Sequence, residues 1–158
     1  TNPSTMYGTS QFGSFVKTNN GGLNINGVAQ PEGKGGQNNW NWVVPFEQDP
    51  ITQDVIYSAF DEIYKSIDGG NSWVSISQNF AEDIDHFKVA PTNNNFMYLA
   101  IDGAFWYTIN GGGIWTQSSL SLVGGRINSI AVHPTDPSKV AIAVMGFTIS
   151  AGKILSGV

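Results

Sequence analysis

The stretch Ser66-Ile67-Asp68-Gly69-Gly70-Asn71-Ser72-Trp73 recurs along the chain and decides the fold. A second copy is Thr108-Ile109-Asn110-Gly111-Gly112-Gly113-Ile114-Trp115, and a shorter one is Thr18-Asn19-Asn20-Gly21-Gly22. Ser156-Gly157-Val158 matches the first positions of another copy. The copies begin at residues 18, 66, 108 and 156, at intervals of 48, 42 and 48 residues. A period of roughly 40–50 residues in a chain rich in β-forming residues predicts the blades of a β-propeller.

A second landmark repeats with a similar period. Turns rich in Pro, Asn and Asp cover 49–54, 90–95 and 133–138, with their first prolines 41 and 43 residues apart. Apolar runs flank these turns and the recurring stretches, which predicts four short strands, A to D, in each unit. The expected ranges are 42–46, 84–89 and 127–132 for A; 55–60, 96–101 and 140–144 for B; 63–65, 104–107 and 153–155 for C; and 73–76 and 115–117 for D.

This pattern predicts an all-β partial propeller of about three and a half antiparallel, four-stranded blades. Residues 1–28 form the end of blade one, 29–76 form blade two with a Gly-rich insertion, 77–118 form blade three, and 119–158 begin blade four. The fourteen expected strands would leave open edges, which natural folds avoid. We therefore expect a piece of a longer protein. Either the rest of its own propeller or another protein should complete the edges.

Composition favours a secreted β protein over a cytosolic helical enzyme. Charged residues make up 12% of the chain, and 19 of its 158 residues are glycine. The chain has no Cys, which excludes disulfides, thiolate chemistry and Cys-ligated zinc; no metal or cofactor site is expected. No apolar stretch reaches about 18 residues, so no transmembrane helix is expected. A net charge of −5 with Arg126 as the single arginine argues against nucleic-acid binding.

The recurring stretches, called box turns below, have a physical explanation without any ligand. The central Asp or Asn accepts backbone hydrogen bonds inside its own turn, the glycines take positive φ, and the Trp packs on the blade. We expect these residues to stabilise the fold, while a carbohydrate or calcium role stays open as the alternative. The box-turn positions are Thr18, Asn20, Gly22, Ser66, Asp68, Gly70, Trp73, Thr108, Asn110, Gly112 and Trp115.

The box turn at Ser66-x-Asp68-x-Gly70-x-Ser72-Trp73 resembles the Asp-box (BNR-like) motif. That motif occurs in sialidases, xyloglucanase-type glycoside hydrolases, sortilin-type receptors and many secreted bacterial propellers. The stretches 54–66 and 84–91 resemble the last group, which includes surface proteins of bacteria with type IX secretion. The resemblance implies an Asp-box propeller that is extracellular or on the cell surface.

Three departures from the motif are visible. Asn20 and Asn110 replace Asp, Ile114 replaces Ser or Thr, and no Trp follows Gly22, where Asn24 stands. The motif is shared by enzymes and non-enzymes, so the resemblance implies the fold more strongly than an activity. A sialidase site would need three arginines, which this chain lacks.

Propeller topology predicts where a ligand would bind. If the box turns lie at one face, the B–C and D–A loops lie at the other, the box-free face. Those loops carry several carboxylates, Glu82 and Asp83 among them, and the Gly-rich insertion leads to Trp40 and Trp42, whose rings could stack on a sugar or pack beneath the loop. The ligand-binding candidates are Trp40, Trp42, Asp61, Asp85, His86, Asp102 and Arg126.

The function that we expect is a non-catalytic scaffold that binds glycans or a protein, and no catalytic residue is assigned. The alternative is part of a glycoside hydrolase, xyloglucanase-like or sialidase-like, whose site is completed by missing blades. A hydrolase needs two converging carboxylates with at least one raised pKa, whereas a scaffold needs none.

Overall fold

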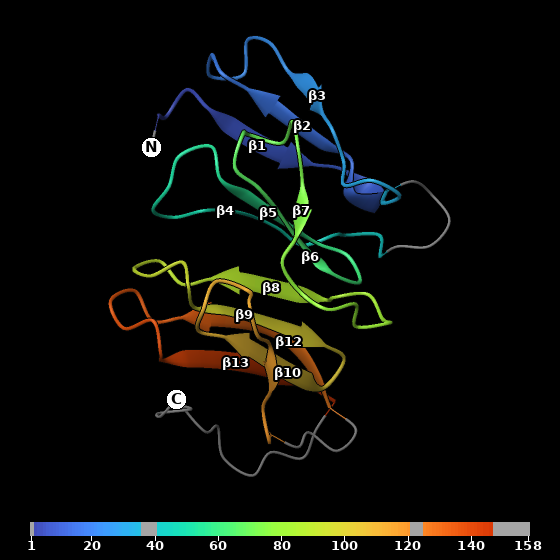
Figure 1. The fold of residues 1–158 in the computed structure, drawn as a ribbon, viewed down its shortest axis with the longest axis vertical. Helices are drawn as coiled ribbons and strands as arrows, with labels where there is room; N and C mark the ends of the chain where they lie inside the picture. The colour runs from blue at the N-terminus through green and yellow to red at the C-terminus, as the bar shows by residue number, and fades with distance from the viewer. Residues whose placement is uncertain (1, 36–40, 121–124, 147–158) are drawn as a thin grey trace.

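The computed structural model describes residues 2–35, 41–120 and 125–146, and it is all-β (Figure 1). The sequence-based prediction of a partial propeller is confirmed. Four antiparallel sheets follow one another along the chain, with the strand orders β1-β2-β3, β4-β5-β6-β7, β8-β9-β10-β11 and β12-β13. The single helical turn among the described residues is a 3-10 turn, Gln11–Gly13.

The strands have the following bounds. They are β1 (Met6–Thr9), β2 (Phe15–Thr18), β3 (Asn26–Val28), β4 (Phe46–Gln48), β5 (Ile56–Ala59), β6 (Ile63–Ser66), β7 (Val74–Ser75), β8 (His86–Val89), β9 (Met97–Ile101), β10 (Ala104–Thr108), β11 (Thr116–Gln117), β12 (Arg126–Val132) and β13 (Val140–Met145).

One strand range in the sequence-based prediction was wrong. The inner strand of the second sheet begins at Phe46 rather than at Trp42, because the segment before Pro45 contacts the 3-10 turn instead of a neighbouring strand. The Phe12 N–H donates to the Trp42 carbonyl over 3.1 Å. The expected C strand at 153–155 and the box turn at 156 lie outside the described residues.

The hydrophobic core lies between the sheets. One cluster joins Tyr57 and Ile63 of the second sheet to Phe87 and Leu99 of the third. A second cluster joins the third sheet to the fourth through Phe105 and Ile130, and a third joins the first to the second. Each sheet therefore buries apolar side chains against its neighbours in sequence, which explains the stacking seen in Figure 1.

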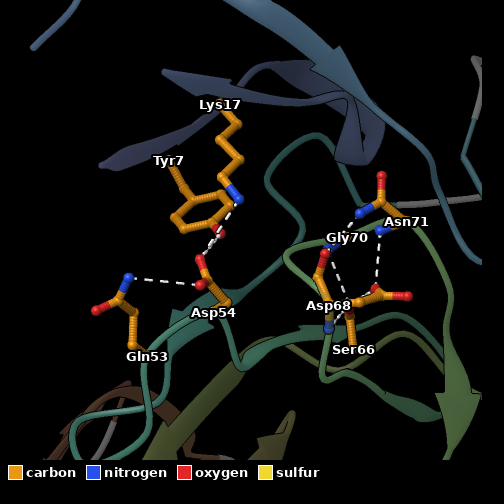
Figure 2. Close-up of polar contacts among 8 residues, drawn as sticks. All are labelled: Tyr7, Lys17, Gln53, Asp54, Ser66, Asp68, Gly70 and Asn71. Carbon is orange, nitrogen blue, oxygen red and sulfur yellow. Dashed lines mark hydrogen bonds and ion pairs between the residues drawn. The ribbon is translucent and has the colours of Figure 1, made fainter. Parts of the chain in front are cut away.

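The box turns form by local hydrogen bonding. Asp68 Oδ1 accepts the backbone N–H groups of Asn71 and Ser72 over 3.0 and 2.9 Å, and Ser66 Oγ accepts the Gly70 N–H over 2.8 Å (Figure 2). Asn110 Oδ1 accepts the Ile114 N–H over 2.9 Å. The hydrogen bonds expected at Asp68 and Asn110 are thus present. They lower the pKa of the Asp68 carboxyl, with the Ser72 hydroxyl and N–H as the largest causes.

Asn20 forms the same turn, and it shows that the comparison of Asn24 with Trp was misaligned by one residue. Asn20 Oδ1 accepts the Asn24 N–H over 2.9 Å, so Asn24 occupies the position of Ser72. Ile25 therefore stands at the Trp position, and 65% of its surface is exposed.

In the two box turns that have a Trp, this residue contacts the preceding sheet. Trp73 Nε1 donates to the Ala29 carbonyl over 2.8 Å, and Trp115 Nε1 donates to the Ile76 carbonyl over 3.1 Å. Trp115 is buried as expected, whereas Trp73 is only partly buried. The reason is that Trp73 packs on the small first sheet, against Phe15 at a ring distance of 5.9 Å.

A second polar cluster also joins the first and second sheets. The Lys17 ammonium and the Tyr7 hydroxyl both reach Asp54 Oδ1, each over 3.5 Å (Figure 2). Burial lowers the pKa of Lys17, but hydrogen bonding and charge from Tyr7 and Asp54 outweigh it, so the pKa of Lys17 is raised overall.

Candidate functional site

The loops of the box-free face surround a groove that we call the Arg126 groove. It consists of two adjoining hollows of about 320 and 360 Å³, which share Asn41, Asp85 and Arg126. The first is also lined by Trp42, Val43, His86, Ile127, Asn128 and Met145, and the second by Ala81, Glu82, Asp83, Ile101 and Asp102.

The arginine ties the third sheet to the fourth at the centre of this groove. Arg126 opens β12, and its Nη2 lies 3.0 Å from Asp102 Oδ1 and 3.4 Å from Asp85 Oδ1. Asp85 Oδ2 accepts the backbone N–H of Asp102 over 2.7 Å. The Arg126 side chain is 60% exposed, and its guanidinium has more N–H groups than these two ion pairs use.

Backbone bonds at the sheet ends place these groups. The Asp85 N–H donates to the Ala100 carbonyl, and the Ile127 N–H donates to the Asp102 carbonyl, each over 2.9 Å. Asp102 adopts a left-handed φ of 51°, a conformation that Asp tolerates in tight turns. Three residues that are distant in sequence are therefore held together by the backbone.

An exposed aromatic ring lies at one side of the groove. Trp42 is 67% exposed and contacts Phe12 edge-on at a ring distance of 5.1 Å. The sequence left open whether Trp42 stacks on a sugar or packs beneath the loop, and the structure places the ring largely in solvent. Its predicted companion, Trp40, lies outside the described residues.

His86 lies at the start of β8 and is partly buried. It lines the hollow that contains Trp42. Five of the seven candidates, namely Trp42, Asp85, His86, Asp102 and Arg126, thus line the same groove.

Asp61 has a different position. Its Oδ1 lies 2.6 Å from Lys34 Nζ, and its Oδ2 accepts a hydrogen bond from Asn79 over 2.8 Å. Both charged side chains of the Lys34–Asp61 pair are less than one-fifth exposed. Asp61 therefore anchors the Gly-rich insertion to the second sheet instead of lining the Arg126 groove.

Sequence reasoning counted Asp83 among the loop carboxylates but did not select it. It lines the groove, and burial raises the pKa of its carboxyl. A backbone hydrogen bond from Asn41 opposes this shift, and the negative charges of Asp61, Asp85 and Glu82 add to it. The run Glu82-Asp83-Ile84-Asp85 was the available sequence signal for this raised pKa. Closely spaced carboxylates repel one another, which disfavours the charged form of each.

The groove can bind a polar ligand through two kinds of group. The aromatic ring of Trp42 offers an apolar face, and Arg126, Asp85, Asp102 and Asn41 offer hydrogen bonds. Within residues 2–35, 41–120 and 125–146, no group of three or more His, Asp or Glu side chains is arranged to hold a metal ion. No helix in these ranges could cross a membrane.

Comparison with solved structures shows the same fold in larger proteins. The GH74 enzyme of Niastella koreensis has a TM-score of 0.69 at 19% identity, covering 89% of this chain and 23% of that one. The GH74 xyloglucanase of Xanthomonas campestris has a TM-score of 0.65 at 12% identity, covering 97% and 27%. YCF48 bound to D1 peptide has a TM-score of 0.57 at 13% identity, covering 94% and 51%.

These likenesses establish the fold alone, because every identity is below 20%. The chain spans about a quarter of the length of the two GH74 proteins. Comparison of the sequence with protein-family models and with curated protein sequences gives no match.

Proposed function

We propose that this chain is part of an extracellular propeller that binds carbohydrate in the Arg126 groove without cleaving it. The observation that carries the proposal is the juxtaposition of an exposed indole with an exposed guanidinium held by two carboxylates. Sugar rings present one apolar face and a girdle of hydroxyl groups, so a stacking ring beside charged donors and acceptors suits them. The fold shared with xyloglucanases supports the choice of a polysaccharide ligand.

A second candidate function, glycoside hydrolysis, has one observation in its favour. Asp83 has a raised pKa, and Asp85, which lines the same hollow, lies 3.4 Å from Arg126 Nη2. Glycoside hydrolysis uses a pair of carboxyl groups, and a raised pKa suits one of them to the role of general acid. In that case Asp83 would donate the proton to the leaving group. The hydrolytic activity would then fall as the pH rises through the pKa of Asp83.

The binding proposal is tested by calorimetric titration of the chain with xyloglucan oligosaccharides and with cello-oligosaccharides. We expect Trp42→Ala and Arg126→Met each to weaken binding at least tenfold. Lys139→Met is the matched control, because Lys139 is also exposed and forms an ion pair with Asp136 but lies outside the groove. Equal binding by all variants would refute the groove as the site.

Hydrolysis is assayed with the same oligosaccharides. If the chain or its longer parent releases reducing ends and Asp83→Asn abolishes this while binding persists, the function is catalytic. If binding occurs without turnover in the wild type, the scaffold interpretation holds.

The box turns support a more specific proposal about the family and the location of the protein. Their motif resemblance and their turn geometry support membership of the secreted Asp-box propellers, including the sortilin-type and type IX-secretion proteins. Detection of the parent protein in culture medium or at the cell surface would test the location, and recovery in the cytosol would refute it.

A further inference from the structure

The loop between β1 and β2 is longer than its counterpart in the second sheet and reaches the Arg126 groove. Residues 10–14 connect the paired ends of β1 and β2, whereas 60–62 connect the paired ends of β5 and β6. The longer loop contains the 3-10 turn, and Phe12 of this turn contacts Trp42, which lines the groove. The added residues therefore bring an aromatic ring of blade one to the groove.

Phe12 has a strained backbone. It adopts φ 60° and ψ 29°, in the left-handed region, where a bulky side chain is an outlier. Of the four non-glycine residues with positive φ in the described part of the chain, Phe12 is the one aromatic residue. Such strain persists only where the surrounding structure fixes the residue, and it is concentrated at active sites and ligand-binding sites.

Three contacts with blade two fix the turn in this conformation. Gly13 packs so closely on the second sheet that a Cβ at this position would lie 2.7 Å from Phe60 Cζ. The Gly13 carbonyl accepts a hydrogen bond from Gln30 Nε2 over 2.6 Å. The Phe12 N–H donates to the Trp42 carbonyl over 3.1 Å. The strain at Phe12 is thus maintained by the neighbouring blade.

The Phe12 ring lies against an exposed indole. The Phe12 and Trp42 rings meet edge-on, with their centroids 5.1 Å apart and their planes at 71°. Trp42 is nevertheless 67% exposed. The backbone N–H of Asn41 donates to the Asp83 carboxylate, so the main chain is held on both sides of the Trp42 side chain. With the main chain held, the Phe12 ring limits the orientations open to the indole.

We propose that Phe12 is a positioning residue that fixes the indole of Trp42 in the orientation required to stack on a sugar ring. This inference rests on the proposed carbohydrate function. A ring that is ordered before the ligand arrives loses less rotational freedom on binding, so the Phe12 contact raises the affinity without touching the ligand. An edge-on contact uses at most one face of the indole and leaves the other face for the sugar.

The first test measures the order of the indole by ¹⁵N relaxation of its Nε1–H group in the labelled 158-residue chain, with Trp42→Ala to assign the signal. We expect Phe12→Leu, which keeps the backbone N–H but removes the aromatic ring, to increase the fast motion of the Trp42 indole. Phe12→Tyr keeps the ring and should leave this motion unchanged. Phe80→Leu is the matched control, because Phe80 meets Trp106 edge-on at a ring distance of 5.2 Å. It should loosen the Trp106 indole and not that of Trp42.

The second test measures binding of xyloglucan oligosaccharides and cello-oligosaccharides by calorimetry. We expect Phe12→Leu to weaken binding about fivefold and Phe12→Tyr to preserve it. Phe12→Gly adopts the left-handed φ without strain, so it decides the matter if Phe12→Leu does not fold. It should weaken binding at least as much as Phe12→Leu.

Failure of this inference differs from failure of the carbohydrate function. If the wild type binds neither oligosaccharide series, the carbohydrate function is refuted, and the role of Phe12 is refuted with it. If the wild type binds and the Leu and Gly variants bind equally well, the role of Phe12 alone is overturned. A Trp42 indole that is as ordered in these two variants as in the wild type would also overturn it.

Discussion

Asp49 is the residue whose burial depends most clearly on hydrogen bonding. It is 1% exposed, and its carboxylate accepts bonds from the Ile51 and Thr52 N–H groups, the Tyr57 hydroxyl and the Asn94 amide, over 2.7 to 2.9 Å. Burial alone would raise the pKa of Asp49, but these donors outweigh it and lower the pKa overall. Because Asn94 belongs to the next repeat, Asp49 also joins two blades.

We expect Asp49→Ala to lower the free energy of unfolding by about 3 kcal/mol, because four donors would be left without their partner. Urea unfolding at pH 7 measures this. The pKa of Asp49 is lowered on folding, so its contribution is fully present above the ordinary value of 3.8 and is lost as the pH falls below it. The difference between the wild type and Asp49→Ala should therefore shrink in acid. A constant difference from pH 7 to pH 2 would contradict this account.

The pKa of Asp83 shifts on folding in the opposite direction to that of Asp49. Its pKa is raised on folding, so its charged form destabilises the native state at neutral pH. We expect Asp83→Asn to raise the thermal midpoint at pH 7 and to have less effect at pH 3, where the carboxyl is protonated in both states. Asn can still accept the N–H of Asn41. A lower midpoint at pH 7 would show that the Asp83 charge stabilises the groove.

Among the elements, the box turn connects one blade to the blade before it. The second glycine of each turn has a left-handed φ, 94° at Gly22, 95° at Gly70 and 100° at Gly112. A Cβ at Gly70 would overlap Val28 Cγ1, and one at Gly112 would lie 2.5 Å from the Ile76 carbonyl oxygen. At Gly22 the nearest group is Met6 Cε, 3.9 Å away.

These three glycines separate backbone strain from packing between blades. Gly22→Ala should cost about 1 kcal/mol, because it introduces only the strain of a positive φ. Gly70→Ala and Gly112→Ala should cost at least about 2 kcal/mol more, because the neighbouring blade must also move. Chemical denaturation of the three variants tests this. Equal losses would show that the turns do not couple the blades.

At the scale of the whole molecule, Arg126 spans two blades with little expected effect on stability. Its ion pairs with Asp85 and Asp102 are exposed, and such pairs contribute about 0–1 kcal/mol. We expect Arg126→Met to leave the free energy of unfolding within about 1 kcal/mol of the wild type while removing carbohydrate binding. A large loss of stability would instead assign Arg126 a structural role.

The repeat pattern allowed much of the fold to be predicted. The periods of the box turns and of the proline turns predicted antiparallel sheets, and the structure has them. Strand ends were less predictable. Residues 42–45 are apolar but are not a strand, because they contact the 3-10 turn at Phe12. An apolar pattern indicates that a segment is buried, but it does not show which element the segment pairs with.

The sequence by itself determined the blade architecture and the box turns, because their hydrogen bonds join residues at most four positions apart. Tertiary structure decided which candidates meet. Backbone hydrogen bonds between blades bring Arg126 and Asp85 together. Asp61 instead forms an ion pair with Lys34 of the Gly-rich insertion. The pKa of Asp83 also depends on burial and on charges from several loops, none of which a linear pattern encodes.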